Sequence, residues 1–141
     1  MRFFFDRSMS WRLALMVDAF EDEHTAVAHD RDGRFRTTTP DTEWLSALAA
    51  DDPPWVVVSG DGRILTRPAE RQVLREANLT YFCMSRQWSK MKIPEYAWKF
   101  IKVWPEIVKA AKVSITLPKI FEVSGGHGLK VREIGRTSGP V

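Results

Sequence analysis

Three aspartates in separate segments have the spacing expected of residues that share one chemical task. Asp6 ends the aromatic run "RFFF", and Asp61 comes just after "WVVVSG". Unbroken apolar runs of this kind are typical of strands covered on both faces in a parallel sheet. Asp41 follows Pro40 at a predicted helix start. Because parallel strands end, and crossover helices begin, at the same edge of a sheet, we expect the three carboxylates to meet there.

Carboxylates gathered at one edge repel one another, so either one of them keeps a proton or a cation joins them. Hard oxygen ligands without cysteine or clustered histidine favour Mg²⁺ or Mn²⁺ over zinc. Such an ion activates a water molecule and neutralises a phosphodiester. The sequence therefore predicts a metal-dependent nuclease in which Asp6, Asp41 and Asp61 are the catalytic metal ligands.

Glu43 is a further candidate ligand near the same helix start. Two residues apart on a helix, Asp41 and Glu43 point to nearly opposite sides, so both are not expected to bind one ion, and Asp41 is favoured. An alternative stays open, in which both acids only complement the positive end of the helix dipole.

Five neighbouring residues are predicted to bind the substrate: Arg7, Ser8, Ser59, Arg34 and Arg63. Arginines in loops near the acidic edge can hold the phosphates of a polyanionic substrate on either side of the cut. The serines can hydrogen-bond within the site, although a serine in a turn or cap is the more ordinary role. Arg7 has a second interpretation, because its charge can neutralise the pocket and weaken metal binding.

Two tryptophans are predicted to differ in role. Trp88 stands in the polar segment "RQWSKM", which favours an exposed ring able to stack on an unpaired base. Trp104 belongs to an apolar stripe at helical spacing, which predicts a place in the core.

The order of predicted elements indicates an α/β fold. Strands are expected at 2–5, 24–29, 55–61 and 78–84. Helices are expected at 10–20, from 40, at 68–74 and from 94, where Pro105 should kink or divide the last helix. Alternating strands and helices predict a three-layer α/β/α sandwich with a central, mainly parallel sheet. After residue 113, "KIFEV" and "LKVREI" suggest a hairpin, followed by a frayed end.

Composition limits the class of protein. A chain of 141 residues with 44% hydrophobic and 28% charged residues fits one globular domain and offers no membrane-spanning run. The acid at position 6 argues against a secretion signal, and a single cysteine cannot form an internal disulfide, so we expect a cytoplasmic protein. The net charge of +3 is compatible with a polyanionic partner without requiring one.

The ordered set "FFFDRSMSWRLA", "TPDTEWL", "WVVVSGDGRIL", "RPAERQVLREANLTYF" and "RQWSKM" resembles the PIN-like domain family, most closely its small branch of bacterial toxin–antitoxin toxins. The resemblance implies the α/β/α sandwich and an Mg²⁺- or Mn²⁺-dependent endoribonuclease held in check by an antitoxin. Position by position, it places the family's acids on Asp6, Asp41 and Asp61. The sequence departs from the family pattern at "DRSMS", and it lacks a clear fourth acid.

The resulting prediction is a PIN-like nuclease domain at 1–112, with a hairpin and tail extension at 113–141. It would cleave single-stranded RNA as a toxin, with a cognate antitoxin and a homodimer as expected partners and no membrane. One alternative is a catalytically weak PIN-like module whose acidic rim binds a basic partner segment. A receiver-like phosphoacceptor domain ranks last, because it usually needs paired acids after the first strand.

Overall fold

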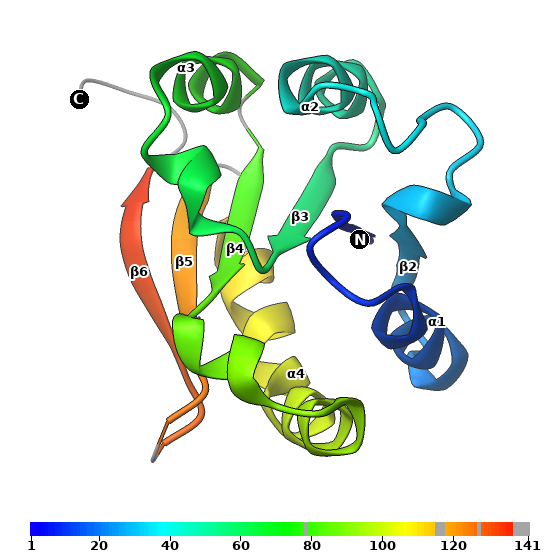
Figure 1. Ribbon diagram of the computed structural model, residues 1–141, viewed down its shortest axis with the longest axis vertical. Helices are drawn as coiled ribbons and strands as arrows, with labels where there is room; N and C mark the ends of the chain where they lie inside the picture. Colours follow the sequence, from blue (N-terminus) through cyan, green and yellow to red (C-terminus); the bar gives the residue numbers. More distant parts are fainter. Residues whose placement is uncertain (78, 115–117, 127, 137–141) are drawn as a thin grey trace.

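The computed structural model describes residues 1–77, 79–114, 118–126 and 128–136. Within them, one sheet of six strands has the order β2-β1-β3-β4-β5-β6 (Figure 1). The first five strands in this order run parallel, and β6 is antiparallel to β5. The strands are β1 (Arg2–Phe5), β2 (Thr25–Ala28), β3 (Trp55–Ser59), β4 (Thr80–Met84), β5 (Lys119–Ser124) and β6 (Lys130–Arg136).

Helices cover both faces of the sheet. The helices are α1 (Trp11–Phe20), α2 (Asp41–Ala49), α3 (Pro68–Ala77) and α4 (Ile93–Val113), with short 3₁₀ turns η1 (His29–Arg31), η2 (Gly62–Leu65) and η3 (Arg86–Lys90). In Figure 1, α1 and α4 lie on one side of the sheet, and α2 and α3 lie on the other. The predicted α/β/α sandwich with a mainly parallel sheet is confirmed.

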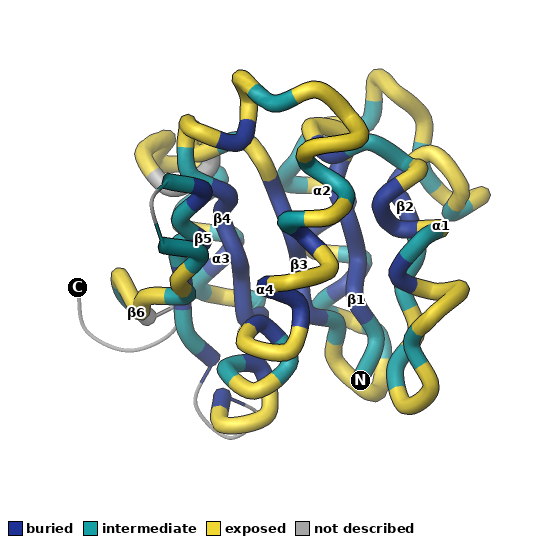
Figure 2. The backbone as a smooth tube through the Cα atoms, turned by 90° about the horizontal axis from the view of Figure 1, so that it is seen from below, coloured by how far each residue is buried: buried dark blue, intermediate teal, exposed yellow. Residues whose placement is uncertain are grey.

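The opening aromatic run is a central strand that packs on both helical layers. Phe3 contacts Trp104 of α4, with 4.6 Å between ring centroids, whereas Phe4 stacks on Trp44 of α2 at 5.3 Å. Figure 2 shows β1 and β3 buried in the interior of the molecule. Because successive side chains of a strand point to opposite faces, only a strand covered on both sides accommodates consecutive phenylalanines. This packing holds the end of β1 rigidly.

Helix α4 continues through Pro105 from Ile93 to Val113, so the alternative of two separate helices is wrong. Proline removes the hydrogen bond to the carbonyl four residues earlier, here that of Ile101. Both residues are exposed, so water can satisfy that carbonyl group. Despite its length, α4 is too polar to span a bilayer, and no other helix in the described part of the chain could span one either.

Trp88 is a core residue, and its predicted exposure is wrong. The 3₁₀ turn η3 directs the ring inward, where it is 1% exposed and its Nε1 donates to the Val123 carbonyl at 3.0 Å. The ring lies so close to Gly125 that a Cβ there would come within 2.7 Å of Nε1. Trp104 is buried on α4, as predicted. Trp88 therefore cannot stack on an RNA base in this arrangement.

The predicted C-terminal hairpin is present as β5 and β6. Strand β5 also pairs with β4, so the hairpin extends the central sheet. The proposed boundary at residue 112 stays a prediction, and residues 137–141 of the expected frayed end lie outside the described part of the chain.

The central position of Phe4 predicts a large loss of stability on truncation. Phe4→Ala should lower the free energy of unfolding by about 3–5 kcal/mol, because it removes a fully buried aromatic ring. Urea denaturation monitored by circular dichroism measures the change. The matched control is Leu15→Ala on α1, where the side chain is 58% exposed and the expected change is within about 0.5 kcal/mol. Equal losses in the two variants would contradict this description of the core.

Candidate functional site

Three carboxylates from separate elements line one pocket of about 340 Å³, together with Arg63 and Arg67. Asp6 directly follows β1, Asp41 is the first residue of α2, and Asp61 caps the N-terminus of η2 after β3. The chain leaves β1 and β3 at the same edge of the sheet because these strands pair in parallel. The remaining lining residues are Arg7 and Ser8.

Two serines connect Asp6 to the end of β3. The Ser8 backbone N–H donates to Asp6 Oδ1 at 3.0 Å, and the Ser8 hydroxyl donates to the same oxygen. Ser8 Oγ also accepts from the Gly60 N–H at 2.8 Å and lies 3.3 Å from Ser59 Oγ. Ser59 Oγ accepts in turn from the Asp61 N–H at 3.0 Å. This network fixes the two strand ends relative to each other.

Asp6 is a buried acid with a raised pKa. Its side chain is 6% exposed, and burial is the main reason that its pKa is raised to about 6. Hydrogen bonds from Ser59 and Ser8 lower the pKa, whereas the negative charge of Asp41 raises it further. Among the ion pairs of the described residues, none includes Asp6. A cation in this pocket would therefore relieve an unfavourable charge.

The other two acids are already partnered. Arg63 donates to both carboxylate oxygens of Asp61 at 2.9 Å, through Nε and Nη2, and these contacts lower the pKa of Asp61. The Trp44 indole N–H donates to Asp41 Oδ1 at 2.9 Å, and Arg7 Nη2 lies 3.7 Å from that oxygen.

The residues of this pocket fit a divalent cation by their chemistry. Three carboxylates with nearby hydroxyls are the oxygen ligands that Mg²⁺ and Mn²⁺ prefer. In the present arrangement, no group of three or more acids, histidines or cysteines in the described residues is close enough to hold an ion. Arg63 is 70% exposed, so moving its side chain away from Asp61 costs little. Binding by all three acids thus requires the acids to come closer together and Arg63 to leave Asp61.

Three predicted site residues do not line the pocket, and one of them, Ser59, is fully buried. Glu43 is exposed on α2 and is not one of the residues that line the pocket. Arg34 pairs with Asp32 at 2.9 Å and with Asp51 at 3.0 Å. Asp51 lies between α2 and β3, before the strand begins and thus toward the opposite edge of the sheet. The structure offers no support for metal binding by Glu43 or substrate binding by Arg34.

Sequence reasoning missed two residues that hold the acids in place. Trp44 orients Asp41 through its indole N–H, and the i,i+3 spacing on a helix was a signal that could have revealed this pair. The Tyr81 hydroxyl lies 3.4 Å from the Asp61 carbonyl oxygen. No local pattern reveals that contact, because Tyr81 is on the next strand of the sheet.

The fold and the pocket define a class of protein: an α/β/α domain that gathers carboxylates at the carboxyl edge of a mainly parallel sheet. Residues 1–86, more than half of the chain, match the model of the family described as PIN like domain. The chain therefore belongs to the PIN-like domain family, whose members are typically nucleases, and the matched range contains all three acids. No curated protein and no solved structure matched the chain.

The raised pKa of Asp6 predicts that stability falls as the pH rises. The folded state prefers the protonated acid, so its contribution is fully present below the unfolded pKa of about 3.8 and is lost as the pH passes about 6. In EDTA, the free energy of unfolding of Asp6→Asn should therefore equal that of the wild type near pH 3.5. Above pH 7 it should be about 3 kcal/mol higher than that of the wild type. Urea denaturation across this pH range measures the difference.

Asp61→Asn is the matched control, because the pKa of Asp61 is lowered and its carboxylate stabilises the fold at neutral pH. This variant should be less stable than the wild type at pH 7. A destabilised Asp6→Asn protein at pH 7 would contradict the assigned environment of Asp6.

Proposed function

We propose that this PIN-like domain is a metal-dependent endoribonuclease that cleaves single-stranded RNA. The observation that carries the proposal is the convergence of Asp6, Asp41 and Asp61 on one pocket that also contains arginines. Carboxylates suit a divalent cation, and arginines suit the phosphates of a polyanion. The residue types that metal-dependent phosphodiester cleavage uses thus line one pocket.

In this proposal, Asp6, Asp41 and Asp61 would hold Mg²⁺ or Mn²⁺. When bound, the ion supplies a Lewis acid that generates a nucleophile from water and neutralises the phosphodiester. Ser8 holds the Asp6 carboxylate in a fixed orientation, and the Ser8 hydroxyl in turn contacts that of Ser59. This rigidity matters because catalytic groups lose much of their effect when they are misplaced by about 1 Å.

Arg7 and Arg63 have two successive partners in this proposal. Without a cation, they neutralise Asp41 and Asp61. If the three acids held a cation, Arg7 and Arg63 would be free to bind RNA phosphates at the rim of the same pocket. Arg67 lines the same pocket and lies 3.8 Å from Glu70 on α3.

The more specific part of the proposal is that the protein is the toxin of a bacterial toxin–antitoxin pair. The resemblance of its ordered segments to the toxin branch supports this role. It makes RNA the substrate, a cognate antitoxin and a second copy of the chain the partners, and the cytoplasm the compartment. A nuclease domain at 1–112 with an extension at 113–141 belongs to the same proposal.

A second candidate function is an interaction module that binds a basic segment of a partner without catalysis. The observation in its favour is that Arg7 and Arg63 already pair with two of the three acids. A basic segment could replace these arginines at the same carboxylates. Metal dependence separates the two candidates.

Removing any one of the three acids should abolish RNA cleavage. Asp6→Asn, Asp41→Asn and Asp61→Asn are each expected to lower the rate more than about 100-fold, because each removes a metal ligand. Cleavage of a fluorogenic single-stranded RNA with Mn²⁺, against EDTA, measures the effect. Asp22→Asn, an exposed acid in a bend after α1, is the control and should retain full activity.

Undiminished cleavage by purified Asp6→Asn protein would contradict the assignment of this pocket as the catalytic site. A wild-type protein that neither binds Mg²⁺ or Mn²⁺ nor cleaves RNA would instead support the interaction module.

Arg67 should contribute to RNA binding through charge alone. Arg67→Gln is expected to weaken binding uniformly across RNA sequences and to reduce the slope of log K against log salt by about 0.7, the value for one phosphate contact on a single strand. Fluorescence anisotropy at several salt concentrations measures the slope. Arg12→Gln on α1, outside the pocket lining, is the matched control. An unchanged slope in Arg67→Gln would rule out a phosphate contact at this position.

A further inference from the structure

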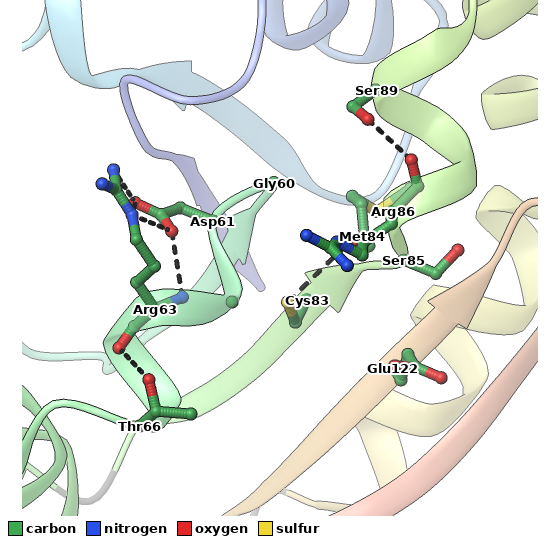
Figure 3. Close-up of a pocket in the computed structure, with 11 residues that line it drawn as sticks. Gly60, Asp61, Arg63, Thr66, Cys83, Met84, Ser85, Arg86, Ser89 and Glu122 are labelled. Atoms are coloured by element: carbon green, nitrogen blue, oxygen red, sulfur yellow. Dashed lines mark hydrogen bonds and ion pairs between the residues drawn. The ribbon is translucent and has the colours of Figure 1, made fainter.

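A second pocket, of about 480 Å³, lies beside the acidic pocket and shares Asp61 and Arg63 with it. We call it the β4–β5 pocket, because Cys83 of β4 and Glu122 of β5 line it. Figure 3 shows Asp61 and Arg63 on one side of this pocket and Ser89 of η3 on the other. A bound polymer with one unit in the acidic pocket can thus place its next unit in the β4–β5 pocket.

The base of this pocket is the sheet itself, at a point where its helical cover ends. Cys83 and Glu122 are paired neighbours in the register of β4 and β5. Ile120 points to the same face of β5 as Glu122 and is buried with the core under α2 and α3. The Glu122 side chain is 38% exposed. The cover therefore stops between these two residues and leaves the Glu122 carboxylate open to a ligand.

The charges around the pocket favour a neutral ligand that donates hydrogen bonds. The lining carries two acids, Asp61 and Glu122, and two arginines, Arg63 and Arg86, so its formal charges cancel and a neutral ligand needs no compensating charge. The thiol of Cys83 stays neutral because burial raises its pKa to about 11. Gly62 lies against this thiol, since a Cβ at that position would be 3.7 Å from Sγ. These small apolar groups suit the flat face of a base.

Arg132 orients the carboxylate of Glu122, which is the hydrogen-bond acceptor in this pocket. Its Nη2 donates to Glu122 Oε1 at 3.0 Å, across the β5–β6 pair. A carboxylate offers about four lone-pair positions on two oxygens, so Glu122 retains the capacity to accept from a ligand. Guanine is the base that presents two neighbouring donors, N1–H and N2–H, on one edge. Adenine, cytosine and uracil present at least one acceptor beside each donor on that edge, which a carboxylate repels.

We propose that the β4–β5 pocket binds a guanine base of single-stranded RNA, one nucleotide from the phosphate held at the acidic pocket, and that Glu122 selects it. This inference rests on the proposed function for the identity of the polymer. Single-stranded RNA is suited to such recognition, because its unstacked bases expose their hydrogen-bonding edges to protein side chains.

Binding in the absence of cleavage tests the proposal. The full chain carrying Asp6→Asn, in EDTA, is titrated with labelled hexauridine and with the same oligonucleotide carrying one guanosine. The guanosine oligonucleotide should bind about tenfold more tightly, as expected for one good contact between a carboxylate and a base edge. Adding Glu122→Gln should remove this preference and leave the affinity for hexauridine unchanged or slightly higher.

Glu133→Gln is the matched control, because Glu133 is an acid of the same sheet that pairs with Lys119 at 3.1 Å and does not line the pocket. It should retain the preference for guanosine. Equal affinities for the two oligonucleotides, or a preference that survives Glu122→Gln, would overturn the proposal. So would loss of the preference in the Glu133→Gln control, because the effect would then be one of general charge.

A cleavage assay with the wild-type chain, in which Asp6 is intact, separates this inference from the proposed function. Preference for guanosine in binding, without any metal-dependent cleavage, would refute the nuclease and retain the pocket. Metal-dependent cleavage at all sequences alike, with equal binding of the two oligonucleotides, would refute the guanine pocket alone.

Discussion

The structure depends above all on a carboxylate placed at the end of its most hydrophobic strand. Phe3, Phe4 and Phe5 are fully buried, and Asp6 follows them into a site that is only 6% exposed. An ionised acid at such a position is unfavourable unless it is hydrogen-bonded or paired. Ser8 provides the hydrogen bonds, and no cation among the described residues forms an ion pair with Asp6. The cost is what a bound metal ion would remove.

The same requirement organises the residues around Asp6. The Ser8 hydroxyl bridges to the end of β3 through Gly60 and Ser59, so the acid of one strand is fixed relative to that of its neighbour. A site on rigid strand ends keeps its geometry better than one on loops. The arginines complete the balance by neutralising the outer acids, where solvent screening makes their pairing easy to exchange. A buried inner acid with a raised pKa and two outer acids with exchangeable partners together suit reversible binding of a cation and a polyanion.

Arg63 also connects the two pockets. Its guanidinium lies on the wall between the acidic pocket and the β4–β5 pocket, bonded to both oxygens of Asp61. Release of Arg63 from Asp61 would therefore change both pockets together.

The sequence by itself determined the layers of the fold and the meeting of Asp6, Asp41 and Asp61 at one edge of the sheet. Unbroken apolar runs, helical stripes and residues at strand ends are local patterns, and their consequences at one edge of a parallel sheet follow from general topology. The structure differs from the sequence-based predictions where residues that contact one another are distant in the chain. Trp88 is buried because Val123 and Gly125 close over it, although its own segment is polar.

Only the tertiary structure decided how the charges pair and where the second pocket lies. Arg34 and Arg63 look alike in sequence, yet Asp51 holds the first away from the site and Asp61 holds the second within it. Glu122 faces an opening because the helical cover ends beside it, a fact of packing between β5 and elements that precede it by dozens of residues. Pairing and exposure depend on distances of a few ångströms between separate elements, and no local pattern encodes those distances.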